Sequence, residues 1–307
     1  MSRAPIVASV RAQAKLNLFL RVLAREDSGF HQVETLFCRI GLADHVTVHV
    51  TSGTRSLDCS GEQATAAELG PVEKNIAWRA AVAYAGATGF PAGFEVTVEK
   101  RIPVGAGLGG GSADGGAVLR ILNALNPRPL DMPALLQLAT SLGADVPFLT
   151  QDRATLALGW GRGERLVLLP NLPASAAWIL VPDVRVSTAE AYAWLDESRV
   201  GRDARALSVG ALTSWASVAR SAANDFEPVV AGHVPVVGSL LAALRSEALR
   251  HVLGQSGMVL MSGSGSAVAV IVGERPDRDL GPPPAAPGVR ILETETATFV
   301  EPVVLTH

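Results

Sequence analysis

The sequence predicts an α+β protein of two domains, and three observations lead to this prediction. The chain has 307 residues, which suggests two domains at roughly 150 residues each. Its first half alternates segments of period two, typical of antiparallel strands, with segments of helical period. A glycine-containing segment near residue 160 then separates this half from a second series of strands and helices. We therefore expect an N-terminal domain over residues 1–165 and a C-terminal domain over residues 166–307.

The first domain shows clear signals for strands and for helix ends. Alternation of apolar and polar residues predicts half-buried strands, and capping residues with a following apolar repeat predict helices. In chain order, the expected elements are strands at 46–50 and 94–98, a helix from about Asn75 to Ala87, a helix from the N-cap Ser112 to Asn126, and a helix from the N-cap Asp131 to Gly143.

The second half begins with strands again and then mixes both kinds of element. A proline-rich segment at 281–288 has no periodicity and is expected to be a surface loop. The expected elements are strands at 154–158, 165–170 and 178–181, a helix near 188–195, a polar stretch at 196–205, a helical pattern at 240–250 and two short strands around the glycine-serine turn at 262–266.

Composition excludes several classes of protein. With 48% hydrophobic and 18% charged residues the chain is not intrinsically disordered, and a net charge of −3 makes nucleic acid an unlikely partner. Cys38 and Cys59 form neither a disulfide framework nor a CxxC metal site, which suits a reducing compartment. No apolar run approaches the length of a membrane span, and charged residues interrupt the N-terminus before a signal peptide develops. We expect a cytoplasmic protein that does not bind membranes.

The strongest chemical signal is the segment Pro103–Ser112, which has five glycines at 105–111 directly before a helix. Glycines let the backbone approach a ligand closely, and the helix N-terminus attracts phosphate. A Rossmann fingerprint is excluded because no buried strand precedes the segment and no acidic residue follows about twenty positions on. A Walker A loop is excluded because the lysine is missing. The segment fits a nucleoside triphosphate.

Pro103–Ser112 resembles the central motif of the GHMP kinase superfamily. Seven further segments are informative: AKLNL at 14–18, GFH at 29–31, ETLF at 34–37, LGADVPF at 142–148, GRGE at 161–164, NDFE at 224–227 and SGSG at 262–265. They resemble the branch whose members phosphorylate the 2-hydroxyl of a cytidylylated methylerythritol in isoprenoid precursor synthesis. This resemblance implies a two-domain GHMP kinase fold, in which a domain like the second domain of ribosomal protein S5 precedes a ferredoxin-like domain.

A kinase of this type needs a group that accepts the proton of the acceptor hydroxyl. Asp145 lies in a turn between Gly143 and Pro147, and the resemblance implies that it is the catalytic base. Lys15 stands in an apolar segment, where its ammonium group needs a partner, and it is the expected partner of Asp145. Asn17, two residues further along a strand, is expected on the same side and is a candidate for orienting the substrate.

The resemblance also implies a cytosine site. Phe30 and Tyr192 are expected to stack on the base, His31 to form hydrogen bonds with it, and Thr188 to line the same site. Phe30 departs from the family pattern, in which tyrosine is usual, so a hydroxyl is lost while the ring remains.

For ATP, the resemblance implies contacts along the glycine loop and an adenine pocket that includes Asn75 and Lys100. The expected loop contacts are Pro103, Val104, Gly105, Ala106, Gly107, Leu108, Gly109, Gly110, Gly111, Ser112 and Ala113.

Mg²⁺ is expected to accompany ATP, and Ser112 and Asp114 are its candidate contacts. Ala113 replaces a serine of the family pattern, and Gly115 and Gly116 replace alanines at a cost in helix propensity of about 1 kcal/mol each. The turn at 262–266 is expected to face the phosphates, although a plain hairpin turn explains it as well.

The function that the resemblance implies is ATP-dependent phosphorylation of the cytidylylated methylerythritol, and we expect a monomer or weak homodimer. Alternatives are a GHMP kinase that acts on homoserine or mevalonate, and a silent sensor that binds ATP and a metabolite. The presence of both Lys15 and Asp145 argues against a sensor. A dinucleotide-binding oxidoreductase is less favoured for the reasons of spacing given above.

Overall fold

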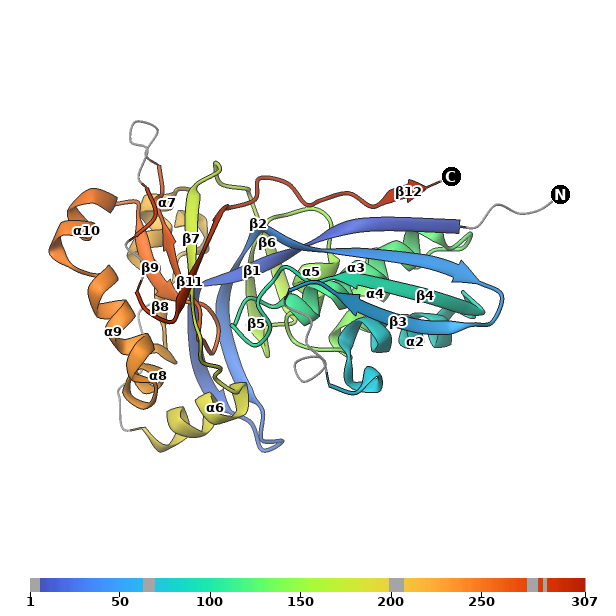
Figure 1. The fold of residues 1–307 in the computed structure, drawn as a ribbon, viewed down its shortest axis with the longest axis horizontal. Helices are drawn as coiled ribbons and strands as arrows, with labels where there is room; N and C mark the ends of the chain where they lie inside the picture. Colours follow the sequence, from blue (N-terminus) through green and yellow to red (C-terminus); the bar gives the residue numbers. More distant parts are fainter. Residues whose placement is uncertain (1–5, 63–69, 199–206, 275–280, 284–285, 307) are drawn as a thin grey trace.

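The computed structural model describes residues 6–62, 70–198, 207–274, 281–283 and 286–306. It contains two β-sheets with helices packed against each, and the long strands β1 and β2 extend from one half of the molecule to the other (Figure 1). The predicted α+β architecture is confirmed. No helix in these described ranges has both the length and the apolar character that crossing a membrane requires.

The first sheet is built around the antiparallel strands β1 (Ile6–Arg25) and β2 (His31–Thr51). Its order is β12-β1-β2-β4-β3, while β5 pairs with β2 and β6, and β8 pairs with β1. Only the β3–β4 and β1–β8 pairs are parallel among the described strands. The other members are β3 (Arg55–Ser60), β4 (Gly93–Glu99), β5 (Leu156–Gly161), β6 (Arg165–Leu169), β8 (Ala223–Asn224) and β12 (Val304–Thr306).

Helices cover one face of this sheet, and their ends partly differ from the prediction. Asp131 caps α4 as expected, and Asn75, the expected start of the preceding helix, is the N-cap of α2. Ser112 is not an N-cap, because the helix already begins at Gly110 after Gly109 in a left-handed conformation. Similarly, α4 ends with Ser141 as its C-cap, so the expected end at Gly143 is wrong. The elements are η1 (Val72–Lys74), α2 (Ile76–Thr88), α3 (Gly110–Leu125), α4 (Met132–Thr140) and α5 (Val146–Thr150).

Two glycines inside α3 permit close packing with its neighbours. A Cβ atom on Gly115 would lie 2.5 Å from Cγ2 of Ile76 in α2. On Gly116 it would lie 2.8 Å from the backbone of Leu149 in α5. Real Cβ atoms do not approach neighbours this closely, so the helices could not pack as they do around alanine. The loss of helix propensity at these positions therefore has a structural reason.

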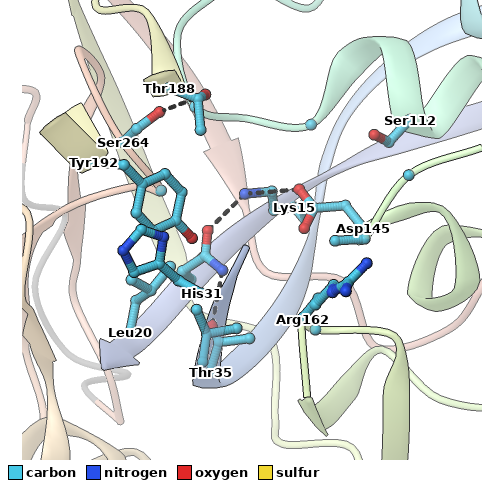
Figure 2. Close-up of a pocket in the computed structure, with 18 of the residues that line it drawn as sticks. Lys15, Leu20, His31, Thr35, Ser112, Asp145, Arg162, Thr188, Tyr192 and Ser264 are labelled. Atoms are coloured by element: carbon cyan, nitrogen blue, oxygen red, sulfur yellow. Dashed lines mark hydrogen bonds and ion pairs between the residues drawn. The ribbon is translucent and has the colours of Figure 1, made fainter. Parts of the chain in front are cut away.

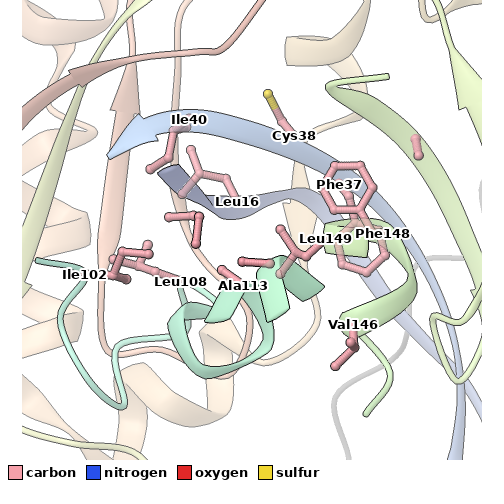
Figure 3. Close-up of a cluster of buried hydrophobic side chains, with 14 of the residues drawn as sticks. Leu16, Phe37, Cys38, Ile40, Ile102, Leu108, Ala113, Val146, Phe148 and Leu149 are labelled. Atoms are coloured by element: carbon pink, nitrogen blue, oxygen red, sulfur yellow. The ribbon is translucent and has the colours of Figure 1, made fainter. Parts of the chain in front are cut away.

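The main hydrophobic core lies between the first sheet and helices α2, α3 and α5 (Figure 3). The rings of Phe37 and Phe148 stack there with centroids 4.9 Å apart. Arg39 is buried beside them and donates to the carbonyl oxygens of Phe148 and Gln151 at 2.7 and 2.9 Å. Burial lowers the pKa of Arg39 to about 9. These contacts fix the short helix α5 and therefore the residue that precedes it, Asp145.

The second sheet is antiparallel, with the order β11-β7-β10-β9. A second core packs helices against it, and the two strands predicted around 262–266 are confirmed as β9 and β10. The elements of this half are β7 (Ala176–Pro182), α6 (Thr188–Glu197), η2 (Val209–Ala211), α7 (Trp215–Ser221), α8 (Glu227–His233), α9 (Pro235–Leu244), α10 (Glu247–Leu253), β9 (Met258–Met261), β10 (Val268–Ile271) and β11 (Val289–Glu295).

Some predicted segments lie partly outside the described residues. The polar stretch begins within α6, and most of it lies outside the described residues, as does part of the proline-rich segment. β6 begins where the sequence predicts the domain boundary, but it pairs with β5 in the first sheet. Near the C-terminus, β12 returns to β1 of the same sheet. The division near residue 165 stays a prediction.

Candidate active site

Two glycine loops meet at the centre of the molecule. The first, Pro103–Gly109, joins β4 to α3, and the second, Ser262–Ser266, joins β9 to β10. Oγ of Ser262 donates to the carbonyl oxygen of Gly107 at 3.0 Å. A Cβ atom on Gly107, whose φ is +80°, would lie 2.1 Å from the carbonyl oxygen of Ser262. Glycine is therefore required for this contact between the halves.

Lys15 reaches the junction of these loops from β1. Its side chain is only 4% exposed, and Nζ lies 2.5 Å from Oδ1 of Asn17 and 3.2 Å from Oδ2 of Asp145 (Figure 2). Its backbone N–H donates to the carbonyl oxygen of Leu108 in the first glycine loop at 3.0 Å. Irregularities in the β1–β2 pairing flank the segment Lys15–Asn17, and both side chains line one cavity. The structure thus brings Lys15, Asn17 and Asp145 together.

Asn17 and Asp145 both contact the ammonium group of Lys15, and each is held in a different way. Nδ2 of Asn17 donates to Oγ1 of Thr35 at 2.8 Å, and Thr35 in turn donates to the carbonyl oxygen of Phe19. Asp145 is the N-cap residue of α5, but its side chain makes no capping hydrogen bond. Its carboxylate is 29% exposed. A carboxylate with a fixed cation and an open side can accept a proton from a bound hydroxyl.

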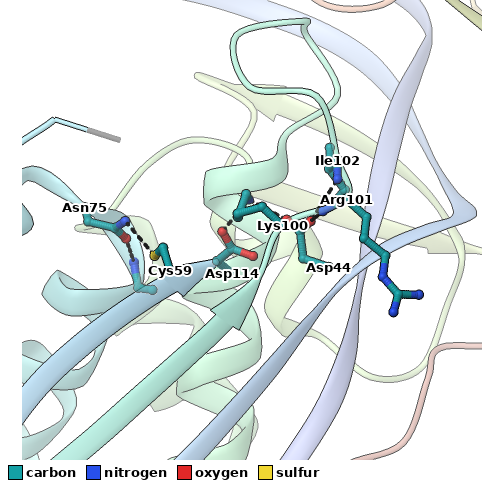
Figure 4. A network of polar contacts seen from close by, with 8 residues as sticks. Asp44, Cys59, Asn75, Lys100, Arg101, Ile102 and Asp114 are labelled. Carbon is teal, nitrogen blue, oxygen red and sulfur yellow. Dashed lines mark hydrogen bonds and ion pairs between the residues drawn. The ribbon is translucent and has the colours of Figure 1, made fainter. Parts of the chain in front are cut away.

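A buried ion cluster lies beneath the start of the first glycine loop (Figure 4). Nζ of Lys100 pairs with Asp44 and, at 2.7 Å, with Oδ2 of Asp114. Oδ1 of Asp44 also accepts from the backbone N–H groups of Arg101 and Ile102 at 2.6 and 2.8 Å. The cluster therefore ties β2, the end of β4 and α3 to the segment that enters the loop.

The charged groups in this cluster shift one another's pKa values. Burial disfavours the charged form of Lys100, but Asp114 and Asp44 outweigh this effect and raise the pKa of Lys100. Burial raises the pKa of Asp114 to about 7, with Asp44 adding to the rise and Lys100 opposing it. Oδ1 of Asp114 is buried without a hydrogen-bond partner. Lys100 occupies the other oxygen, and Asp114 lines the cavity. Its role as a metal contact stays a prediction.

The predicted base-binding residues gather at the other end of the site. His31 and Tyr192 stack with ring centroids 4.4 Å apart and an interplanar angle of 15°. The rings of Tyr192 and Phe226 also pack in a T-shaped arrangement, with centroids 4.9 Å apart. Burial and the charges of Asp145 and Asp196 raise the pKa of Tyr192 to about 12, so its hydroxyl stays protonated. The two predicted contacts with the base therefore also contact each other.

Phe30 has a different environment from the other rings. Its side chain is 56% exposed, and the guanidinium carbon of Arg162 lies 3.9 Å from its ring centroid. Arg162 also donates to Oε2 of Glu26 at 2.7 Å, which joins the turn before β2 to the turn after β5. One face of Phe30 is thus covered by an arginine of the GRGE segment.

A single cavity of about 1970 Å³ connects these groups. Asn75 lines it while its Oδ1 accepts from the N–H of Ala77. Oγ1 of Thr188 lies 3.0 Å from Oγ of Ser264 in the second glycine loop. Ala113 is the one predicted site residue that does not line the cavity, because it is buried in the main core. The predicted site residues that do line it are Lys15, Asn17, Phe30, His31, Asn75, Lys100, Pro103, Val104, Gly105, Ala106, Gly107, Leu108, Gly109, Gly110, Gly111, Ser112, Asp114, Asp145, Thr188 and Tyr192.

The structure adds three residues that the sequence alone does not single out. Arg162 and Asp196 line the cavity. The side-chain amide of Asn224 donates to the carbonyl oxygens of Met261 and Gly263 and so supports the second glycine loop. Arg162 and Asn224 stand in segments that the resemblance includes. Asp196 follows Tyr192 by four positions, and on a helix this spacing indicates the same face.

Comparisons with known proteins identify the family. A family model described as GHMP kinases N terminal domain matches residues 75–152. The chain is 37% identical over 270 residues to a protein of Solibacter usitatus named 4-diphosphocytidyl-2-C-methyl-D-erythritol kinase, with 85% of this chain and 80% of that protein covered. The chain belongs to the 4-diphosphocytidyl-2-C-methyl-D-erythritol kinase family. A member from Halorhodospira halophila is 38% identical, over 84% of this chain and 82% of its own.

Solved structures agree with membership of this kinase family. The crystal structure of a 4-(cytidine 5'-diphospho)-2C-methyl-D-erythritol kinase superposes with a TM-score of 0.70 at 34% identity, covering 94% of this chain and 98% of that one. A homoserine kinase from Cytophaga hutchinsonii gives a TM-score of 0.67 at 19% identity, over 100% of this chain and 98% of its own, which shows the fold alone. The predicted GHMP kinase fold is confirmed.

Proposed function

We propose that this chain transfers the γ-phosphoryl group of ATP to the 2-hydroxyl of 4-diphosphocytidyl-2-C-methyl-D-erythritol. The curated relatives carry the name of this kinase and align over most of the chain. The observation that carries the proposal is the contact of 3.2 Å between Nζ of Lys15 and Oδ2 of Asp145, where the two glycine loops meet. A sensor that only binds its ligands has no need for a buried cation beside an accessible carboxylate.

Asp145 is the proposed acceptor of the hydroxyl proton. The ammonium group of Lys15 lies beside this carboxylate and stabilises the negative charge that develops on the attacking oxygen. Asn17 accepts from Lys15 and therefore holds the ammonium group at the site. The reaction is then a direct in-line transfer from ATP to the hydroxyl, without a phosphoenzyme.

The first glycine loop is the proposed cradle for the phosphates. The residues before Gly110 leave backbone N–H groups near the N-terminus of α3, a 16-residue helix whose dipole favours anions. Asn75 lines the same cavity and stays a candidate for the adenine pocket. For Lys100 we propose an indirect contribution, since its ammonium group is bound to Asp44 and Asp114 and these hold the loop entrance.

Mg²⁺ is expected to arrive with the phosphates of ATP, and when bound it neutralises their charge. Within the described ranges no group of three or more His, Cys, Asp or Glu side chains could hold a metal ion. Asp114 is engaged in the buried cluster. The candidate protein contact is the hydroxyl of Ser112, which lines the cavity and offers an oxygen donor of the kind that Mg²⁺ prefers.

The acceptor substrate would extend from Asp145 toward Tyr192. Thr188, His31 and Phe30 lie along this end of the cavity and suit a polar group followed by a base. Homoserine and mevalonate carry no base, so displacement of labelled substrate by cytidine nucleotides would distinguish the proposed acceptor from these alternatives.

The decisive variant for this proposal is Asp145→Asn, because the amide keeps the shape but cannot accept the proton. We expect turnover to fall by about two to four orders of magnitude in a coupled assay with ATP and the cytidylylated substrate. Calorimetry should show that ATP still binds. Asp58→Asn, at an exposed position of β3, is the matched control and should be fully active. Near-normal turnover in Asp145→Asn would rule out this base.

A further inference from the structure

His31 is held on two sides by residues of one helix. Its ring stacks on Tyr192, and its Nε2 atom lies 2.9 Å from Oδ1 of Asp196. Both residues belong to α6, four positions apart, whereas His31 begins β2. The imidazole is nearly buried, with 6% of the side chain exposed. These contacts fix both the plane of the ring and the direction of one of its nitrogen atoms.

The contact with Asp196 also decides which nitrogen carries the proton. An ionised carboxylate can only accept hydrogen bonds, so Nε2 must be the donor. Nη1 of Arg25 lies 3.5 Å from the other oxygen of Asp196 and places a positive charge beside it. A neutral imidazole with its proton on Nε2 has a bare Nδ1, which is an acceptor. Within the described chain Nδ1 makes no hydrogen bond to protein, and the residue lines the cavity.

We infer that Asp196 is a positioning residue that makes His31 selective for cytosine. This inference rests on the proposed function, because it concerns the base of the proposed substrate. Cytosine carries an exocyclic amine, which donates, at the position where uracil carries a carbonyl oxygen, which accepts. An acceptor at Nδ1 pairs with the amine, whereas it faces a second acceptor on uracil. A buried site that leaves such groups unpaired rejects the wrong ligand strongly.

Asp196 needs no direct contact with the substrate for this role. It acts through the tautomer of His31, and Tyr192 acts through the orientation of the ring. Removing the carboxylate should therefore change which base is preferred more than it changes the rate of transfer. A residue with a merely structural role would not alter that preference.

The kinetic test compares the cytidylylated substrate with its uridylylated counterpart. In Asp196→Asn the amide can donate as well as accept, so both tautomers of His31 become possible. We expect the ratio of kcat/KM for the two substrates to fall about tenfold, through a higher KM for the cytidine form. The kcat and the KM for ATP should be unchanged. Glu197→Gln removes the same charge from the next residue of α6, which also lines the cavity but is not the hydrogen-bond partner of His31, and should keep the wild-type ratio.

A spectroscopic test does not depend on activity, and the tautomer is read on the wild-type protein. Nitrogen-15 NMR of the histidine side chains, with His31→Gln used for assignment, reports which ring nitrogen of His31 carries the proton. We expect the Nε2–H tautomer in the wild-type protein at about pH 7.5, above the ordinary pKa of histidine. A proton on Nδ1 under these conditions would overturn the inference, as would an unchanged substrate ratio in Asp196→Asn. Failure of the proposed function looks different, because the wild-type protein would then not phosphorylate the cytidylylated substrate at all.

Discussion

Single residues at the proposed base site, the end of the cavity lined by His31 and Tyr192, have contacts that their spacing along the chain does not reveal. Motifs identify Phe30, His31 and Tyr192 as candidates, but the sequence does not show that His31 and Tyr192 stack on each other. That contact joins residues 161 positions apart and depends on how α6 packs against the end of β2. Likewise, the GRGE segment does not indicate that Arg162 covers the ring of Phe30.

Tyr192→Ala tests the base site at this scale. The substitution removes a stacking ring and also the surface that orients His31. Since stacking of a base on an aromatic ring contributes roughly 1–3 kcal/mol, the KM for the cytidylylated substrate should rise about five- to 150-fold. Tyr192→Phe keeps the ring and should be nearly silent. Steady-state kinetics with each substrate varied in turn will measure this, and an effect confined to ATP would mean that Tyr192 does not contact the base.

Among the elements, the first glycine loop depends most strictly on its sequence. Gly109 has a φ of +72°, and a Cβ atom there would lie 2.9 Å from Cγ of Lys15. A side chain at this position must therefore strain the backbone and displace the lysine. The sequence predicts a glycine requirement from the approach of phosphate, whereas the structure adds a requirement from Lys15.

Gly109→Val is expected to lower both the affinity for ATP and kcat, by at least about tenfold each, without unfolding the protein. Gly86→Ala in α2 is the matched control and should leave ATP binding and kcat unchanged, because a Cβ atom there would meet nothing within 4 Å and Gly86 does not line the cavity. Calorimetry with ATP, turnover and a thermal melt should be measured for both variants. Unchanged ATP binding in Gly109→Val would contradict the phosphate-cradle assignment.

The buried cluster beneath the loop gives an expectation for pH dependence. The pKa of Asp114 rises from an ordinary value of about 4 to about 7 on folding, mainly through burial. The folded state therefore binds this proton more tightly than the unfolded state. Its contribution to the free energy of unfolding is fully present below about pH 4 and is lost as pH rises through about 7.

Asp114→Asn removes the titrating group, so the free energy of unfolding should decline less between about pH 5 and pH 8 than in the wild-type protein. Urea titrations at several pH values measure this slope. Asp58→Asn changes an exposed carboxyl and should leave the slope as it is. Parallel pH profiles for Asp114→Asn and the wild-type protein would show that Asp114 does not titrate in this range.

For the molecule as a whole, local patterns predict the elements, whereas non-local contacts escape prediction. Alternation and capping residues predict β4, α2 and the start of α4 because these signals are contained within each segment. The return of β12 to β1 cannot be read in this way, since it pairs residues almost 300 positions apart. The ion cluster of Lys100 escapes for the same reason, because Asp44 comes from another strand.

Asn224 is another residue whose role depends on non-local contacts, because it supports the contact between the two halves of the molecule. It is buried where β8 pairs with β1, and its Nδ2 donates to the carbonyl oxygens of Met261 and Gly263, both at 2.8 Å. Its Oδ1 accepts from the N–H of Phe226 at 2.9 Å. Asn224 therefore holds the second glycine loop, whose Ser262 bonds to the first loop beside Lys15.

Asn224→Ala leaves two buried carbonyl oxygens and one N–H group without their partner, which should lower the free energy of unfolding by about 2–4 kcal/mol. Because the second loop loses its support, kcat should fall as well, by about tenfold or more. Asn171→Ala is the control, since Asn171 also makes hydrogen bonds to the backbone, with Thr155 and Thr298, but does not line the cavity. It should lose stability and keep its kcat. Urea unfolding and turnover measured together separate the two effects, and equal turnover in the two variants would mean that Asn224 supports the fold without positioning the active site.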